Sequence, residues 1–260
     1  MTPDDVGGSL AGLRKMLGSP GPVYSAILTI PDPGVAAILG WSGFDYVVID
    51  AEHAPFTLSS MRSCVDALAS TPAACVVRVL ANDPTHIKQA LDLGVDGVQV
   101  PSVRDAAGAA AAVSAARYSP DGTRGVGLGH ATRYGSNLRE YLREANAKVA
   151  VLAMIEDAAG VTNASEIARV EGLDGVVIGP FDLSADLGLL GQVEHRTVQA
   201  ALDRVVESCV QAGTKVGSLG EVAALARRGV TLFTCFVDGI GLGEAARVAV
   251  ETARAAWTAR

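Results

Sequence analysis

Short apolar runs rich in β-branched residues recur along the chain and predict eight strands. They are Val23–Ile30, Tyr46–Asp50, Ala74–Val79, Gly97–Pro101, Ala150–Glu156, Gly175–Ile178, Lys215–Leu219 and Leu232–Val237. Segments with helical periodicity lie between them, at Thr57–Ala69, Pro84–Leu93, Asp105–Arg117, Ala158–Val170, Val198–Gln211, Glu221–Arg228 and Gly243–Trp257. Strict alternation is typical of a parallel sheet, and eight units close a barrel. We therefore predict an α/β fold, a single (β/α)8 TIM barrel domain over residues 1–260.

An open, doubly wound sheet shares this alternation and is the rival architecture. A dinucleotide site in such a sheet needs a G-x-G-x-x-G turn after the first strand, and the sequence has none there. Gly239, Gly241 and Gly243 follow the eighth strand and could imitate a phosphate loop. We interpret them as turn residues, and the barrel remains the prediction.

One connection is too long for a simple loop. Residues Ser119–Lys148 hold the glycine-rich run Asp121–Gly129 and then a predicted helix near Leu138–Ala145. Long insertions in compact domains are often functional or form interfaces. We expect an interface, and an active-site lid is the alternative.

Composition limits the partners. The 260 residues carry a net charge of −7 with no run of Lys or Arg, so neither nucleic acid nor an anionic membrane is an expected partner. The Met1–Ser9 start lacks a basic signal-peptide region, and no apolar run approaches the roughly 20 residues of a membrane span. We expect a cytoplasmic protein. Its four cysteines lack C-x-x-C spacing, which predicts buried thiols instead of a zinc site or disulfides.

Charged residues at the predicted carboxyl ends of the strands are the candidates for chemistry, because barrel enzymes build their sites there. Glu156 follows the apolar run Val149–Ile155, and Asp182 follows Val176–Pro180. A lone buried carboxylate is costly unless it is paired or binds a cation. Two carboxylates at one barrel mouth therefore share a proton or hold an oxygen-preferring Mg²⁺ or Mn²⁺. For Asp182, a helix-capping or turn role is an equal alternative.

His53 and Arg78 occupy the same predicted edge. His53 is the histidine nearest a strand end, beside Asp50 and Glu52, and an imidazole suits a general base. Arg78 could stabilise an oxyanion such as an enolate. The alternatives are a structural histidine and an arginine that only forms a salt bridge. The four lysines, Lys15, Lys88, Lys148 and Lys215, lie on predicted helices or at strand entries, which argues against a Schiff base.

Several motifs, in order, resemble the HpcH/HpaI-type class II pyruvate aldolase family, which includes 4-hydroxy-2-oxoheptane-1,7-dioate and 2-dehydro-3-deoxyglucarate aldolases. The resemblance runs from about Pro20 to Val250. It rests on Gly43–Pro55, Val77–Arg78 with Asn82–Pro84, Arg117–Pro120 with Arg124–Gly127, Ile155–Glu156 and Ile178–Ser184.

The resemblance implies reversible retro-aldol cleavage of a 4-hydroxy-2-oxo acid to pyruvate and an aldehyde. Glu156 and Asp182 would bind a divalent ion, Mg²⁺ or Mn²⁺ with Co²⁺ as a further candidate, which chelates pyruvate and holds its enolate oxygen. His53 would be the acid/base, supported by Asp92, and Arg78 would steady the negative charge. Asp50 and Glu52 would support the histidine and the metal-bound water. We also predict substrate contacts at the set Met154, Gly179, Phe181 and Leu219.

Two positions depart from the family pattern. Many relatives carry Gln at the position of Met154 and a small residue at that of Phe181. Two alternatives therefore stay open: other metal–enolate chemistry on a 2-oxo acid, such as decarboxylation or a different C–C bond formation, and a catalytically silent barrel that acts as a binding module.

A homo-oligomer is a further prediction. The resemblance implies a hexamer made as a trimer of dimers. The predicted terminal helix Gly243–Trp257 carries apolar residues fit for an interface, and the insertion, through Arg124 or Tyr134, could approach a neighbouring subunit's active site.

Overall fold

The computed structural model describes residues 11–258, which form one closed barrel of eight parallel strands in sequence order. The strands are β1 (Val23–Leu28), β2 (Tyr46–Asp50), β3 (Ala74–Arg78), β4 (Gly97–Val100), β5 (Ala150–Ile155), β6 (Gly175–Ile178), β7 (Val216–Leu219) and β8 (Leu232–Val237). Each strand pairs with the next, and β8 pairs with β1. The predicted (β/α)8 fold is confirmed, and the open-sheet rival is excluded.

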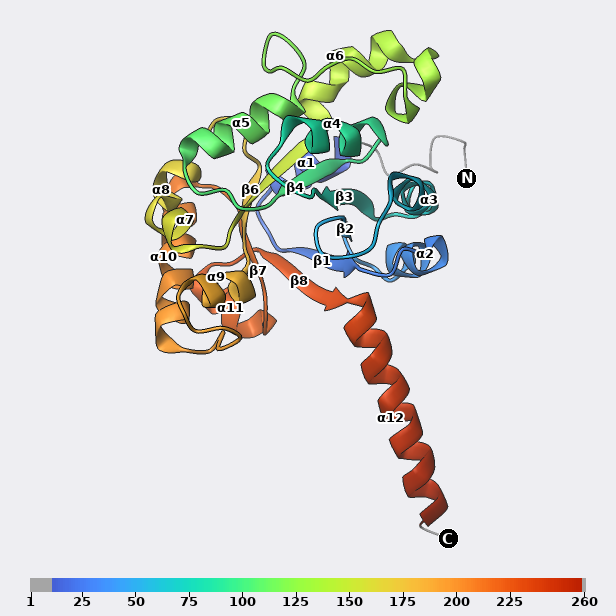
Figure 1. Cartoon of the computed structure of the whole chain (residues 1–260), viewed down its shortest axis with the longest axis vertical. Coiled ribbons are helices and arrows are strands. Elements are labelled where there is room, and N and C mark those ends of the chain that lie inside the picture. Colours follow the sequence, from blue (N-terminus) through green and yellow to red (C-terminus); the bar gives the residue numbers. More distant parts are fainter. Residues whose placement is uncertain (1–10, 259–260) are drawn as a thin grey trace.

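The α-helices lie around the barrel, apart from the last one, which projects away from it (Figure 1). They are α1 (Ala11–Leu17), α2 (Pro33–Trp41), α3 (Leu58–Leu68), α4 (Pro84–Asp92), α5 (Ala106–Ala116), α6 (Leu138–Lys148), α7 (Ala158–Thr162), α8 (Ala164–Ile167), α9 (Pro180–Asp186), α10 (Arg196–Ala212), α11 (Val222–Arg228) and α12 (Asp238–Thr258). The continuous helix predicted over Ala158–Val170 is wrong, because Asn163 ends α7 and separates it from α8.

Alternation of side chains along the strands divides the core in two. Tyr46, Val76 and Leu152 belong to the cluster inside the barrel, whereas Val47 and Val77 pack outward in the cluster shared with the helices. Burying each aliphatic side chain contributes roughly 1.5–3 kcal/mol. The same parity turns the inward positions nearest the carboxyl ends of the strands toward a common mouth, and polar residues replace aliphatic ones there.

The predicted insertion packs against its own barrel. It contains a 3-10 helix, η2 (His130–Gly135), and α6, which contact α4 and α1 respectively. The fully buried Arg124 guanidinium lies 4.6 Å from the Tyr118 ring centroid and donates to Tyr141 Oη. This cluster anchors the connection from within the subunit.

Helix α12 begins directly after β8 and leaves the barrel (Figure 1). Asp238 anchors its start by accepting hydrogen bonds from the backbone nitrogens of Thr29 and Ile30, each 2.8 Å long. It is the one buried residue of the described part of this helix. Gly239, Gly241 and Gly243, which we interpreted as turn residues, lie inside the helix, so that interpretation is wrong.

Three of the cysteines are buried as predicted, namely Cys64, Cys75 and Cys209. Cys235 is exposed, so the prediction is wrong there; it lies in the exposed second half of β8, and α12 leaves the barrel directly after this strand (Figure 1). Residues Met1–Ser9 lie outside the described residues, and so do the outer limits of the predicted domain 1–260. Within residues 11–258, no helix has the length and apolar character required to cross a membrane.

Candidate active site

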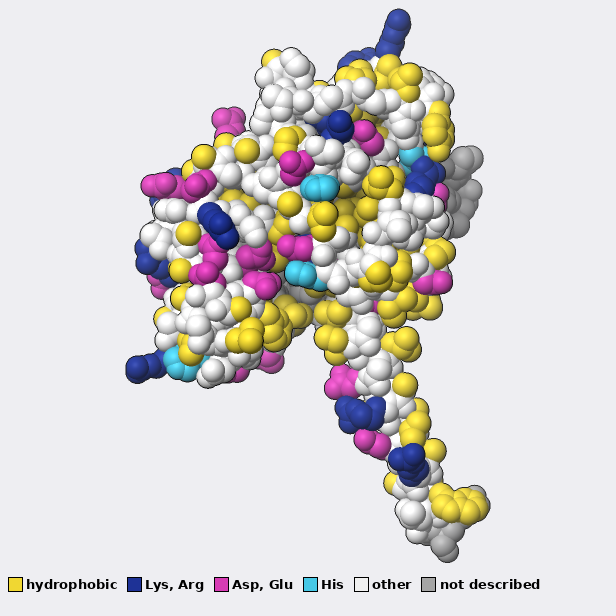
Figure 2. All heavy atoms as spheres, in the orientation of Figure 1, with side chains coloured by type: hydrophobic (Ala, Val, Ile, Leu, Met, Phe, Trp, Pro, Cys, Tyr) yellow, Lys and Arg dark blue, Asp and Glu magenta, His cyan; other side chains and the backbone are white. Residues whose placement is uncertain are grey.

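A cavity of about 280 Å³ opens at the carboxyl ends of the strands. Its lining combines an apolar wall with a few polar groups, as small-molecule sites do. Of the predicted site residues it contains Asp50, His53, Arg78, Met154, Gly179, Phe181, Asp182 and Leu219. Figure 2 shows acidic and histidine side chains gathered near the middle of the visible face of the barrel.

Asp50 and Arg78 form a buried ion pair across two neighbouring strands. Arg78 Nε donates to Asp50 Oδ1 at 2.9 Å, and Nη2 donates to Oδ2 at 2.7 Å. The register of β2 and β3 places the two residues opposite each other. Burial alone would raise the pKa of the Asp50 carboxyl, but the hydrogen bonds and charge of Arg78 outweigh it and lower that pKa. The pair therefore holds a fixed cation at the mouth.

Asp50 also shapes the loop that carries the candidate base. Its Oδ1 accepts hydrogen bonds from the backbone nitrogens of Glu52 and His53, at 3.2 and 3.1 Å. His53 leaves 56% of its side chain exposed, and its Nε2 lies 3.4 Å from Glu52 Oε2. The imidazole is thus beside a carboxylate and open to a ligand in the cavity.

The charged form of Glu52 is in an unfavourable environment. Its Oε2 is buried, has no hydrogen-bond partner among the described residues, and lies 3.5 Å from Arg78 Nε. Burial raises the pKa of this carboxyl to about 7; Arg78 opposes the rise and Glu156 adds to it. A buried carboxylate oxygen that accepts no hydrogen bond depends on nearby cationic groups for its stabilisation.

Glu156 is held from one side. Its Oε1 accepts from Ser102 N at 2.7 Å and from Ser102 Oγ at 3.0 Å. Ser102 adopts φ +55°, a left-handed conformation that is uncommon for a non-glycine residue and tends to occur at functional sites. A Cβ on Gly179 would lie 3.0 Å from Glu156 Oε2, so glycine leaves that oxygen room at the mouth.

Asp182 comes from the adjacent strand connection. Strands β5 and β6 pair directly, with Ile155 opposite Ile178, so the segments that carry Glu156 and Asp182 leave the barrel side by side. Asp182 is exposed in the first turn of α9 and lines the cavity. Oxygen ligands from two neighbouring carboxylates fit a hard divalent cation and leave coordination positions for water or substrate.

The described residues contain no cluster of three or more His, Cys, Asp or Glu that could hold a metal. The described residues therefore do not form a metal site in which three or more of these side chains are ligands. Glu156 does not line the cavity, but it follows the strand adjacent to the one that Asp182 follows, so their assignment as metal ligands stays a prediction.

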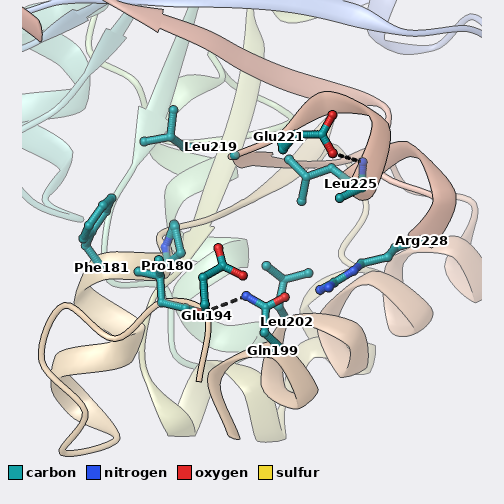
Figure 3. A pocket seen from close by; sticks show the side chains of 12 residues that line it. Pro180, Phe181, Glu194, Gln199, Leu202, Leu219, Glu221, Leu225 and Arg228 are labelled. Carbon is teal, nitrogen blue, oxygen red and sulfur yellow. Dashed lines mark hydrogen bonds between the residues drawn. The ribbon is translucent and has the colours of Figure 1, made fainter. Parts of the chain in front are cut away.

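A second cavity of about 250 Å³ adjoins the first, between α9, α10 and α11 (Figure 3). Pro180, Phe181 and Leu219 line both. Two of its polar side chains have local roles, because Glu221 caps α11 and Gln199 donates to the Val193 carbonyl. Phe181 and Leu219 thus form part of the wall between the two spaces.

Asp92 does not join the other predicted residues within this chain. It is the last residue of α4, and its carboxylate pairs with Arg124 Nη2 at 3.0 Å. In a (β/α)8 barrel the carboxyl end of a helix lies at the opposite face from the mouth. Its support of His53 stays a prediction and, if correct, requires a second copy of the chain.

Sequence reasoning missed Ser102 and Gln99. Ser102 follows β4 at the carboxyl edge of the barrel, but it is neutral, and charge was the signal that singled out the other residues of this edge. Gln99 is 5% exposed in an otherwise apolar strand and lines the main cavity. A polar side chain at an inward strand position was the available signal.

Comparison with known proteins gives consistent matches. The profile of the family "HpcH/HpaI aldolase/citrate lyase" matches residues 28–230. The 4-hydroxy-2-oxo-heptane-1,7-dioate aldolase of Salmonella dublin is 42% identical over 204 residues, covering 78% of this chain and 77% of that protein. The 5-keto-4-deoxy-D-glucarate aldolase of Klebsiella pneumoniae is 40% identical over 199 residues, covering 76% and 78%.

Among solved structures, a HpcH/HpaI aldolase/citrate lyase family protein from Burkholderia cenocepacia J2315 superposes with a TM-score of 0.90 at 36% identity. The match covers 94% of this chain and 99% of that one. The similarity therefore extends over the whole barrel.

The raised pKa of Glu52 predicts a pH-dependent stability in metal-free protein. Between about pH 4.5 and 7 the unfolded chain releases a proton that the folded chain retains, so wild-type stability falls as pH rises and the loss is complete above about pH 7. Glu52→Gln lacks this loss. Urea unfolding of EDTA-treated proteins should show the variant gaining on wild type across that window. A stability difference independent of pH contradicts the prediction.

Proposed function

Because the chain belongs to the HpcH/HpaI aldolase/citrate lyase family and is a carbon–carbon lyase, we propose that it reversibly cleaves a 4-hydroxy-2-oxo acid to pyruvate and an aldehyde. One observation carries the proposal: an arginine fixed by a buried aspartate lines the same cavity as a histidine and an exposed aspartate. These groups provide a cation for a developing oxyanion, a proton carrier and a carboxylate for a divalent ion.

The residues of this chain divide the work of the cleavage. His53 takes the proton of the C4 hydroxyl as the C3–C4 bond breaks, which releases the aldehyde. The bonding electrons pass to C3 and spread onto the C2 keto oxygen, and return of the hydroxyl proton to C3 completes pyruvate. Arg78 faces the developing negative charge without reorganising, because Asp50 already holds its guanidinium in place.

A divalent ion completes the proposal, with Glu156 and Asp182 as its protein ligands and Mg²⁺, Mn²⁺ or Co²⁺ as candidates. Such an ion would act as a Lewis acid on the keto group of the bound acid. The Glu52 oxygen that accepts no hydrogen bond and the room that Gly179 leaves beside Glu156 support a cation there. None of the four lysines lines the cavity, which supports a metal over a Schiff base.

A homo-oligomer also belongs to this proposal, as a hexamer built from dimers. Helix α12 supports it, because Ile240, Leu242, Val248 and Val250 are all at least half exposed and hydrophobic side chains follow one side of the projecting helix in Figure 2. Within the insertion, Arg124 is buried among its own aromatic partners, whereas Tyr134 is 74% exposed. We therefore assign any contact with a neighbour's active site to Tyr134.

Pyruvate, a divalent ion and a panel of aldehydes test the reaction. We expect a 4-hydroxy-2-oxo acid product with at least one aldehyde, and loss of product with a chelator. Borohydride added with pyruvate should trap no adduct, because no lysine is available. A trapped lysine adduct contradicts the metal-dependent class, and exchange of pyruvate methyl protons with no aldol product favours the other enolate chemistry named above.

Substitutions should separate the base from the metal ligand. His53→Ala should lower turnover by about 10²–10⁴-fold with metal affinity retained, because its exposed imidazole is not a proposed ligand. Asp182→Ala should weaken metal binding itself, measured by calorimetry. Asp186→Ala on the same helix is the matched control and should bind metal normally. Near-normal turnover of His53→Ala means that another group is the base.

Charged substitutions on α12 test the assembly. Leu242→Glu with Val248→Glu should dissociate the oligomer, because both side chains are exposed within one chain and burial of two carboxylates at an interface is unfavourable. Light scattering and an activity assay on the same samples should show smaller particles with reduced activity. A fully active wild-type monomer at dilution contradicts the shared-site proposal.

A further inference from the structure

Gln99 is an uncharged polar side chain among the residues inside the barrel. Strand β4 is buried along its length, and Val98 and Val100 pack outward against the helices. Gly97 and Gln99 therefore face inward. Gln99 pairs in register with Arg78, and Arg78 pairs with Asp50. The three polar side chains thus follow one another around the barrel at one level, on β2, β3 and β4.

The amide of Gln99 has a poor partner. Its Nε2 donates to the Met154 Sδ at 3.0 Å, and a thioether is a weak acceptor. None of the hydrogen bonds among residues 11–258 involves its Oε1. Arg78, by contrast, uses two of its donors on Asp50. Gln99 is therefore the polar group of this level whose hydrogen-bonding capacity is least used.

Both Gln99 and Met154 line the main cavity, together with Arg78 and Asp182. A ligand oxygen in that cavity would be a stronger acceptor than the sulfur. The soft, flexible methionine can hold the amide in place beforehand, and the Gln99 N–H can then turn from the sulfur to donate to the ligand. A polar side chain buried in a barrel strand without an adequate partner is costly unless a ligand completes its bonding.

We propose that Gln99 is a substrate-binding residue whose amide donates a hydrogen bond to an oxygen of the 2-oxo acid, on the side of the cavity formed by β4 and β5. This rests on the proposed function above. The amide is neutral and meets an oxygen that is present before and during the reaction. Its bond therefore stabilises bound substrate and transition state alike, and its loss raises KM with little change in kcat.

Two single variants remove the amide. Gln99→Leu and Gln99→Met both keep a side chain of similar size, and the second keeps its length. Calorimetry with pyruvate and Mg²⁺ gives Kd, and hydrogen–deuterium exchange at the pyruvate methyl group gives KM and kcat. We expect Kd and KM to rise about 10-fold, the size of one lost hydrogen bond to a charged or polarised acceptor. The melting temperature checks that the barrel stays folded.

A relocated amide separates binding from structure. In the double variant Gln99→Leu with Met154→Gln the amide returns to the same wall from the neighbouring strand, and pyruvate affinity should recover in part. Gln199→Leu is the matched control, because that amide bonds to the Val193 carbonyl and lines the second cavity alone. It should leave the pyruvate Kd unchanged.

The outcomes are separable. Folded Gln99 variants that bind pyruvate as tightly as wild type overturn the assignment of Gln99, and so does a loss of kcat with an unchanged KM. A wild-type protein that neither binds pyruvate nor exchanges its methyl protons overturns the proposed function and this assignment with it.

Discussion

The buried ion pair of Asp50 and Arg78 is the interaction on which the site depends. Breaking such a pair by removing one partner is far more costly than its net contribution to stability, because the other charge stays buried. Asp50 uses its remaining capacity on the backbone of Glu52 and His53. One carboxylate therefore orients the cation of the site and fixes the loop that carries the candidate base. The parity of two paired strands is what places both side chains inside the barrel.

Around that pair the mouth carries more negative than positive charge. Asp50 and Asp182 line the cavity with Arg78 and His53, and Glu52 and Glu156 lie close to Arg78. Burial raises the pKa of Glu52, and the negative charges of Glu156 and Asp50 add to that rise. Repulsion among these carboxylates destabilises the metal-free protein. A bound divalent cation would offset that repulsion. Ser102 and Gly179 position Glu156. Ser102 donates a hydrogen bond to Glu156 Oε1, and the absence of a side chain on Gly179 leaves space beside Glu156 Oε2.

Much of this could be predicted from the sequence, because barrel strands are short, apolar and separated by helices of ordinary length. Strands β2, β6 and β8 begin and end at the predicted residues, and β1 ends at Leu28 instead of Ile30. The charged residues of the cavity could be predicted because each lies at the end of a predicted strand or shortly after it. The break at Asn163 and the course of α12 did not, since periodicity describes a helix and says nothing of what it packs against.

The remaining site residues were invisible for a related reason. Gln99 and Ser102 are neutral, and their importance comes from neighbours on other strands, Met154 and Glu156. Asp92 shows the converse, because family resemblance assigns it a role that its position beside Arg124 does not support within one chain. Such pairings depend on register and on assembly, which a single sequence does not encode locally.

The central claim is that Asp50 and Arg78 act as one unit on a 2-oxo acid. A double-mutant cycle on methyl proton exchange of pyruvate tests it, with Asp50→Asn, Arg78→Ala and the double variant measured beside wild type. The account predicts that each single variant loses most of the exchange rate and that the double variant loses little more, because Asp50→Asn frees the guanidinium from its fixed position and Arg78→Ala removes it. Near-normal exchange in Asp50→Asn, or losses that multiply in the double variant, would contradict it.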